Sequence, residues 1–427
     1  MRFPRSPWGF PRQALTGCGA IALIALFAVT ARAQTTTLRQ VKQKRSADDK
    51  RPLSLLPLAT IWTLPLNNAL TAPPAFRGTR AVFALEHDQL AAYDLEHGTL
   101  AWIAPRGTTV EPAVGADAVF IAEDESLTAL AITTGDVVWT KPFEQTLAVA
   151  PVLAVDRLIV ATSDGDVVAL RPVDGTEIWR QHLPAAAGSR PAFTSSQLFI
   201  PTTGRLVVAL NLQNGDLLWQ RALGGAGHDI LADDDRIFLG SRDRFFYCLN
   251  AKSGEVEWRW ATGADAIGLP VEDEKSVYFV SLDNILRGLN RSSGVQRWKA
   301  PLPVRPIAGP VKYRETLVVP GSEPLLLGYG TRDGKPQGRY AVATELSAPP
   351  YLFDDAARVF PVLATISSDI VGRATVTGAT RDMAPVDLPM SPLPNETAVP
   401  ALPAPPPDLD AVSPLWTPTP VVPAGGR

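Results

Sequence analysis

Short apolar runs, separated by polar turn segments, recur along most of the chain. Runs such as Val119–Ile121, Leu158–Val160 and Leu198–Ile200 consist of β-branched, aromatic and aliphatic residues, and the segments between them are rich in Gly, Asn, Asp and Ser. Short runs of this composition, bounded by turn residues, are typical of β-strands. The pattern therefore predicts a repeating series of short strands.

A tryptophan recurs at a nearly fixed interval. Seven tryptophans lie 37 to 40 residues apart: Trp62, Trp102, Trp139, Trp179, Trp219, Trp258 and Trp298. From Trp102 onwards a glycine lies four residues before each of them, and Gly334 likewise precedes Gly338, where an eighth tryptophan would fall. A period of this length indicates one structural unit per repeat.

Each repeat is predicted to contain four strands. In the repeat that ends at Trp219, Pro191-Ala-Phe begins the first strand, Leu198–Ile200 forms the second, and Leu206–Leu210 forms the third. The tryptophan strand is the fourth. The glycine before it lies in the turn between strands three and four, because a tight turn needs a positive φ, which glycine adopts without a Cβ penalty.

Four-stranded units of about forty residues are typical of a β-propeller. Seven sets of strands run into positions 102, 139, 179, 219, 258, 298 and 338, and an eighth runs from Pro350 through Val359-Phe360 to Ile370-Val371. The eighth set has no tryptophan strand after it, whereas Ile61-Trp62-Thr63 has no blade before it. We therefore predict an all-β, eight-bladed propeller of four-stranded antiparallel blades, closed by this N-terminal outer strand. A parallel β-helix is the competing architecture, but its turns are shorter and lack a four-strand period.

The seven tryptophans are predicted to be structural. A large ring at a fixed place on the outer strand can fill the wedge between two blades, and its burial contributes at most about 4–6 kcal/mol. Cys248 is the only cysteine after residue 18, so these wedges, rather than a disulfide, are expected to hold the molecule together. Cys248 lies in the apolar run Phe245–Leu249 and is predicted to be buried.

The first 33 residues are predicted to be a secretory signal peptide. They contain four arginines and no acidic residue, an apolar stretch, and an Ala31-Arg-Ala33 cleavage motif. The alternative is an uncleaved membrane anchor over residues 15–31, which is barely long enough to cross a bilayer. Cys18 precedes the apolar stretch instead of following it, which argues against lipidation.

Three further segments differ in composition. Residues 34–57 are polar and charged and are predicted to form a flexible leader. Residues 58–382 form the predicted propeller. Residues 383–427 contain thirteen prolines, which predict a disordered or polyproline-like tail. This tail is either a spacer or a docking ligand for a partner, with Trp416 as its anchor.

Charge excludes some function classes. The formal net charge is −3, and no basic surface indicates nucleic-acid binding. The four histidines form no HxH or HExxH motif, so no metal site is expected. The acidic clusters Glu123–Glu125, Asp233–Asp235 and Glu272–Glu274 are interpreted as solvated turn charges.

The repeats resemble those of a known superfamily. The consensus Leu-[Asp/Asn]-x-x-[Asn/Ser/Thr/Asp]-Gly-x-x-x-Trp occurs at Leu210–Trp219, Leu249–Trp258 and Leu289–Trp298, and Tyr93–Trp102 is similar. These segments resemble the repeats of pyrroloquinoline-quinone-like propellers over about residues 61–380. That superfamily has an enzymatic branch, the quinoprotein alcohol and glucose dehydrogenases. It also has a non-enzymatic, BamB-like branch that serves outer-membrane β-barrel assembly.

The resemblance implies binding rather than catalysis. In calcium-dependent alcohol dehydrogenases of the superfamily, the quinone stacks on a tryptophan near two adjacent cysteines, and Glu, Asn and Asp hold the ion. This sequence has no adjacent cysteines, so no catalytic, cofactor-binding or metal-binding residue is assigned. The BamB-like branch binds its partner through loops that join successive blades. In these loops the candidate partner-binding residues are Arg190, His228, Asp229 and Asp265.

The sequence therefore predicts a non-catalytic protein-binding scaffold without a cofactor. It is expected in the periplasm, bound to envelope proteins such as the outer-membrane β-barrel assembly machinery, with membrane association indirect at most. Two alternatives stay open: a quinoprotein dehydrogenase-like enzyme, and a propeller that binds carbohydrate or cell wall in its central funnel.

Overall fold

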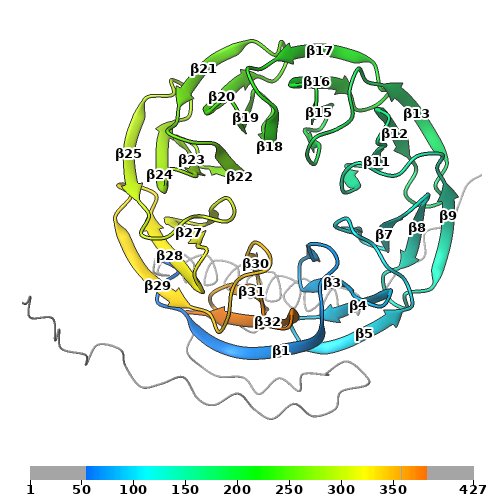
Figure 1. Ribbon diagram of the computed structural model, residues 1–427, viewed down its shortest axis with the longest axis horizontal. Coiled ribbons are helices and arrows are strands. Elements are labelled where there is room, and N and C mark those ends of the chain that lie inside the picture. Colours follow the sequence, from blue (N-terminus) through cyan, green and yellow to red (C-terminus); the bar gives the residue numbers. More distant parts are fainter. Residues whose placement is uncertain (1–53, 357, 382–427) are drawn as a thin grey trace, which may run out of the picture.

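The computed structural model describes residues 54–356 and 358–381, which form a ring of eight four-stranded sheets around a central axis (Figure 1). In each of the first seven blades the strands follow chain order from the axis to the rim, and every neighbouring pair is antiparallel. The predicted eight-bladed propeller is confirmed. The residues that the model describes contain no helix long and apolar enough to cross a membrane.

Blades 1 to 4 have similar strand lengths, with a short inner strand in each. Blade 1 comprises β2 (Ala75–Arg77), β3 (Arg80–Leu85), β4 (Gln89–Asp94) and β5 (Thr99–Ala104). Blade 2 comprises β6 (Ala113–Val114), β7 (Ala118–Glu123), β8 (Ser126–Ala131) and β9 (Val137–Pro142). Blade 3 comprises β10 (Val152–Ala154), β11 (Arg157–Ala161), β12 (Asp166–Leu170) and β13 (Glu177–His182). Blade 4 comprises β14 (Ala192–Phe193), β15 (Gln197–Pro201), β16 (Leu206–Asn211) and β17 (Leu217–Ala222).

The inner strands of blades 5 and 6 are longer than those of blades 1 to 4 and of blade 7. Blade 5 comprises β18 (Gly227–Ala232), β19 (Arg236–Ser241), β20 (Phe245–Asn250) and β21 (Val256–Ala261). Blade 6 comprises β22 (Ala266–Glu272), β23 (Ser276–Ser281), β24 (Ile285–Asn290) and β25 (Gln296–Pro301). Blade 7 comprises β26 (Val311–Tyr313), β27 (Thr316–Pro320), β28 (Leu325–Gly330) and β29 (Pro336–Ala341).

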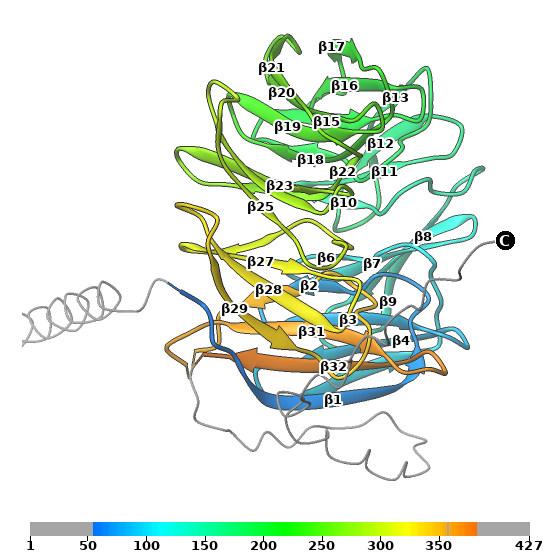
Figure 2. The same ribbon diagram turned by 60° about the vertical axis from the view of Figure 1, so that its left-hand side comes forward.

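The eighth blade is assembled from both ends of the described chain. Its sheet order is β30 (Tyr351–Phe353), β31 (Val362–Ser368), β32 (Arg373–Thr380) and β1 (Ala59–Ala69). β1 pairs antiparallel with β32 (Figure 2). Trp62 lies opposite Gly378 in this pair. The N-terminal strand therefore closes the ring, as the unpaired Trp62 segment predicts.

The middle strands of blade 8 lie later than expected. Val359-Phe360 and Ile370-Val371 were the expected strands, but β31 begins at Val362 and β32 begins at Arg373. Ile370 and Val371 lie in the turn between these strands and are exposed. This turn is fixed by Asp369, whose backbone N–H donates to the Arg373 carbonyl, and by Gly372 at φ +86°. Ile370 and Val371 are therefore apolar residues of a turn, and their side chains do not pack on a sheet.

Each of the six repeat tryptophans from Trp102 to Trp298 joins its blade to the next. The indole N–H groups donate to backbone carbonyls of the following blade at 2.8–3.1 Å, in the pairs Trp102–Ile132, Trp139–Pro172, Trp179–Leu212, Trp219–Ala251, Trp258–Arg291 and Trp298–Thr331. The ring also packs on the turn glycine of that blade: a Cβ at Gly135 would lie 2.7 Å from the Trp102 ring. The repeated glycine therefore has two roles: it adopts a positive φ, and its lack of a side chain leaves a flat surface on which an indole packs.

The last residues of the expected leader are packed. Leu55 and Leu56 are buried in a cluster with Val318 of blade 7 and Leu363 of blade 8. Arg381 Nη1 donates to the Leu56 carbonyl at 3.0 Å. Residues 54–57, expected to belong to a flexible leader, are therefore part of the packed ring. Most of the predicted leader, the predicted signal peptide and the Pro-rich segment lie outside the described residues.

Leu56 occupies the space in blade 7 that a tryptophan ring occupies in blade 6. In blade 6, Gly288 of β24 lies opposite Trp298 of β25, and a Cβ there would meet the indole. In blade 7 the equivalent glycine, Gly328, lies opposite Gly338, which carries no ring. A Cβ at Gly328 would instead meet Leu56 Cδ1. The N-terminal segment therefore supplies the apolar group that blade 7 lacks.

Candidate functional site

The eight blade-to-blade connections lie on one face of the ring. Antiparallel strands alternate in direction, so the connections and the turns between second and third strands share a face, and the glycine turns before the tryptophans lie on the opposite face. We call these the connection face and the turn face. The connections are residues 70–74, 105–112, 143–151, 183–191, 223–226, 262–265, 302–310 and 342–350.

An ion pair links two of these connections across blade 3. Arg190, just before the inner strand of blade 4, donates from Nη1 to Glu111 Oε1 at 2.8 Å. Glu111 lies just before β6, the inner strand of blade 2. The Arg190 side chain is about half exposed, at 47%, whereas that of Glu111 is 28% exposed. The predicted residue Arg190 is thus held at the connection face by an acid that sequence analysis did not single out.

His228 and Asp229 lie in a bulge of the inner strand β18. Gly227 pairs with Ser241 and Ile230 pairs with Leu239, so two residues oppose the single residue Gly240 between them. A bulge of this kind re-aims side chains out of the regular ladder. Both side chains are half-buried.

Electrostatics connect these residues into one cluster. Burial raises the pKa of Glu111, the charge and hydrogen bond of Arg190 oppose the rise, and the charge of Asp229 adds to it. Burial likewise raises the pKa of Asp229, against the attraction of His228 and Arg190. Burial lowers the pKa of His228, against the attraction of Asp265. The four predicted residues therefore share one electrostatic environment with Glu111, which we call the connection cluster.

A cavity of about 560 Å³ lies beside this cluster on the same face. Its lining includes residues 105–110, which lead directly into Glu111, and the turns His87-Asp88 and Glu123-Asp124. Arg106 Nη1 donates to Glu123 Oε1 at 2.8 Å inside it. Glu123, expected to be a solvated turn charge, is thus paired. Donors and acceptors at this face can bind polar and charged groups of a partner.

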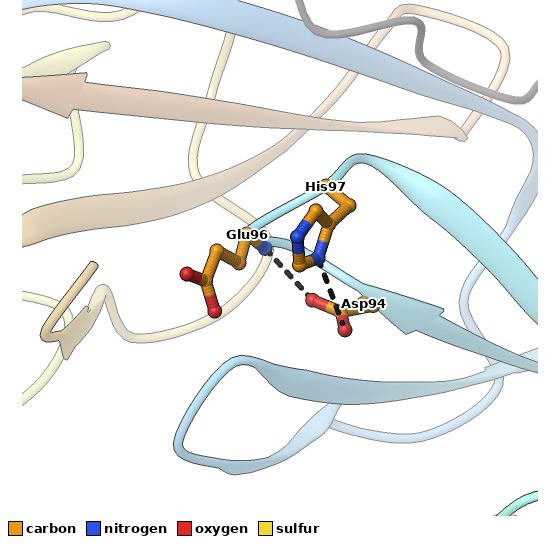
Figure 3. Close-up of side chains that lie close together, drawn as sticks. All are labelled: Asp94, Glu96 and His97. Atoms are coloured by element: carbon orange, nitrogen blue, oxygen red, sulfur yellow. Dashed lines mark hydrogen bonds and ion pairs between the residues drawn. The ribbon is translucent and has the colours of Figure 1, made fainter. Parts of the chain in front are cut away.

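The turn face carries a small group of possible metal ligands. Asp94, Glu96 and His97 lie together in the turn between β4 and β5 (Figure 3). Asp94 Oδ1 accepts the Glu96 backbone N–H at 3.0 Å, and Oδ2 lies 3.5 Å from His97 Nδ1. These contacts stabilise the turn itself, and the His97 side chain is exposed. We therefore do not assign these three residues as a metal site.

The other two acidic clusters are also paired. Arg291 of blade 6 bonds Glu272 of its own blade through Nε at 2.6 Å and Asp235 of blade 5 through Nη2 at 2.8 Å. It also pairs with Asp233. The expectation of purely solvated turn charge is therefore wrong for these residues. The sequence shows an arginine at position 291, but it does not show that Arg291 lies beside blade 5, because that proximity depends on how the blades are arranged in the ring.

The chain matches a known family over most of the propeller. Residues 59–192, 103–230 and 203–355 match the model described as outer membrane protein assembly factor BamB. The chain belongs to this family. No curated protein matches it.

Solved structures share the fold at low identity. BamB from Moraxella catarrhalis aligns with a TM-score of 0.62 and 16% identity over 77% of this chain and 99% of that one. Quinohemoprotein alcohol dehydrogenase from Comamonas testosteroni aligns with a TM-score of 0.62 and 12% identity over 76% of each chain. The computationally designed Ika8 protein gives 0.64 and 12% over 74% of this chain and 98% of that one. At such identities the likeness establishes the propeller fold alone, and it includes both a BamB and a dehydrogenase.

Proposed function

We propose that this BamB-family propeller is an exported, periplasmic and non-catalytic scaffold that serves the assembly of outer-membrane β-barrel proteins. Its partner is an envelope protein of that assembly machinery, bound at the connection face. The proposal is supported chiefly by the connection cluster, in which Arg190, Glu111 and Asp229 come from three different blades and meet at one face. Charged groups positioned by a rigid ring are suited to recognising a protein surface.

The use of the tryptophans supports a non-catalytic role. Six indoles donate their N–H to the next blade and place a ring face on its turn glycine, as Trp179 does with Leu212 and Gly215. A ring committed to such an interface is not free to stack on a quinone. Cys248 is buried, and burial strongly raises its pKa, so it is an inert apolar residue rather than a reactive thiol.

Site-specific crosslinking in living cells tests the proposal. A photoreactive amino acid at Arg190 is expected to capture a periplasmic domain of the β-barrel assembly machinery, identified by mass spectrometry. The matched control is Lys335, a more exposed residue on the turn face, which is expected to give no such adduct. Capture of no assembly component from position 190, or equal capture from position 335, would contradict the proposal.

A separate assay addresses the dehydrogenase alternative. Incubation of the purified protein with pyrroloquinoline quinone and Ca²⁺ is expected to leave the quinone absorbance unchanged and to give no dye reduction with alcohols or sugars. A red-shifted absorbance together with substrate-dependent dye reduction would replace the scaffold by an enzyme. A glycan array that shows saturable binding would favour the carbohydrate alternative.

A further inference from the structure

Blade 5 carries a second tryptophan on its outer strand. Trp260 follows Trp258 by two residues on β21, so both side chains point to the same side of the sheet, toward blade 6. Trp258 fills the interblade wedge and donates its N–H to the Arg291 carbonyl. Trp260 stands at the edge of the cluster around Phe238 and Phe246, with part of its ring exposed. The corresponding residues of the other outer strands are Ala104, Lys141, Gln181, Arg221, Ala300, Tyr340 and Leu64.

The two indoles form one wall of a groove on the rim. A hollow of about 480 Å³ is lined by Trp258, Trp260 and the turn of blade 6 from Ser293 to Gln296. Val295 in this turn is 62% exposed. The groove therefore offers the partly exposed Trp260 indole, with Trp258 beside it, and an aliphatic residue opposite them. We call it the rim groove.

One exposed basic side chain flanks the rim groove on blade 6. Trp298 of β25 points to blade 7, where it packs on Gly334. Lys299 follows Trp298 on the strand, so its exposed side chain points the other way, toward blade 5. Arg297, which precedes Trp298 at the irregularity of this strand, bonds Ser276 Oγ instead. The groove thus combines aromatic surface with positive charge.

This chemistry fits an extended, proline-rich and acidic segment. Rows of aromatic rings bind polyproline II helices, because such helices are already extended and lose little entropy on binding. Residues 382–427 of this chain contain thirteen prolines, with five acidic residues and a single basic one. At about 3.1 Å per residue in the polyproline conformation, these 46 residues can reach about 140 Å. A propeller of this size has a radius of gyration of only about 20 Å, so the tail can reach any point of the rim.

We propose that the rim groove is a polyproline-binding site and that its occupant is the chain's own tail, residues 382–427. The Trp260 indole and Val295 contact the prolines, and Lys299 attracts the acidic residues around Asp408 and Asp410. This binding is independent of the connection face, so a partner there and the tail at the rim can be bound together.

Intramolecular photocrosslinking in the full-length protein tests this site. With benzoylphenylalanine at Val295, peptide mapping is expected to show adducts with residues 382–427 within one molecule. The same group at Leu218, exposed on the outer strand of blade 4, is the matched control and is expected to give none. Trp260→Ala is expected to lower the adduct yield at least ten-fold, and replacement of Pro405–Pro407 by alanine is expected to lower it several-fold.

Limited proteolysis gives a second reading that needs no crosslinker. Trp260→Ala is expected to speed cleavage of the tail several-fold while the ring stays folded, whereas Leu218→Ala leaves the rate unchanged. Tail adducts that persist at full yield in Trp260→Ala, adducts found equally from position 218, or adducts only to another protein would overturn the proposal. Covalent dimers in place of intramolecular adducts would also overturn it, because the tail of a second copy would then be the occupant.

Discussion

The side chain of Leu56 lies against the α-carbon of Gly328, although the two residues are far apart in the chain. Leu56 is held there by Arg381, which also bonds the Ser54 carbonyl at 2.5 Å, and it fills the space that an indole fills in blade 6. The first described residues therefore belong to the core of blades 7 and 8.

Leu56→Ala is expected to lower the free energy of unfolding by about 2–4 kcal/mol, because it leaves a cavity in a buried cluster. Urea denaturation of the full-length protein measures the effect. Leu217→Ala on the exposed rim of blade 4 is the control and is expected to change stability by less than about 0.5 kcal/mol. Equal effects of the two variants would show that Leu56 is not part of the core.

A pair of glycine variants separates backbone strain from ring packing. Gly215 has φ +78°, and a Cβ there would lie 2.6 Å from the Trp179 ring. Gly78 also has a positive φ, +57°, but its Cβ would meet nothing within 4 Å. Gly78→Ala is expected to cost about 1 kcal/mol and Gly215→Ala about 2–4 kcal/mol, measured by urea denaturation. Equal costs would mean that the indole contact does not constrain the glycine.

The backbone conformation and the ring contact of Gly215 differ in how far the sequence predicts them. The repeat of Gly and Trp predicts the turn conformation, because φ is a local property. It does not reveal that Gly215 faces Trp179 of the preceding blade, because that contact depends on the stacking of two blades. The leader was mispredicted for a similar reason: polar residues dominate its composition, and the Leu55-Leu56 pair gains a partner only once the ring has closed.

Arg291 is expected to stabilise the contact between blades 5 and 6. Arg291→Met removes its bonds to Asp235 and Glu272 and leaves Glu272, whose side chain is 20% exposed, without its cation. The expected loss is about 1–3 kcal/mol, checked by chemical denaturation. The control is Arg171→Met, which breaks an exposed pair with Asp174 and is expected to cost less than about 0.5 kcal/mol. A loss no larger than that of the control would contradict the role of Arg291.

The connection cluster is expected to make stability depend on pH. Burial raises the folded-state pKa of Asp229 above its ordinary value of 3.8, so ionising this carboxyl costs stability. The cost is absent below pH 3.8 and grows as the pH rises through the raised folded-state pKa. Asp229→Asn is therefore expected to raise the free energy of unfolding at pH 7 by about 0.5–1 kcal/mol. The gain should shrink as the pH is lowered toward 3.8, and a gain that does not vary with pH would refute this account.

The candidate site was only partly predictable. The position of Arg190 and Asp229 in or beside blade connections follows from the repeat, since connections fall between one tryptophan strand and the next inner strand. Glu111 was missed because its partner, Arg190, belongs to a connection two blades away. The bulge at His228 had a weak signal, the proline missing at the start of blade 5, but its geometry follows from the pairing of β18 with β19.

The way the ring closes also sets the order of folding. Strand β1 is made first, yet its partner β32 is made roughly 320 residues later, since Ala59 pairs with Thr380. Until ribosomal synthesis reaches that point, an eleven-residue strand has an unsatisfied hydrogen-bonding edge, and such edges promote aggregation. Strand β1 therefore cannot take its place in the ring until Thr380, about three-quarters of the chain further on, is available.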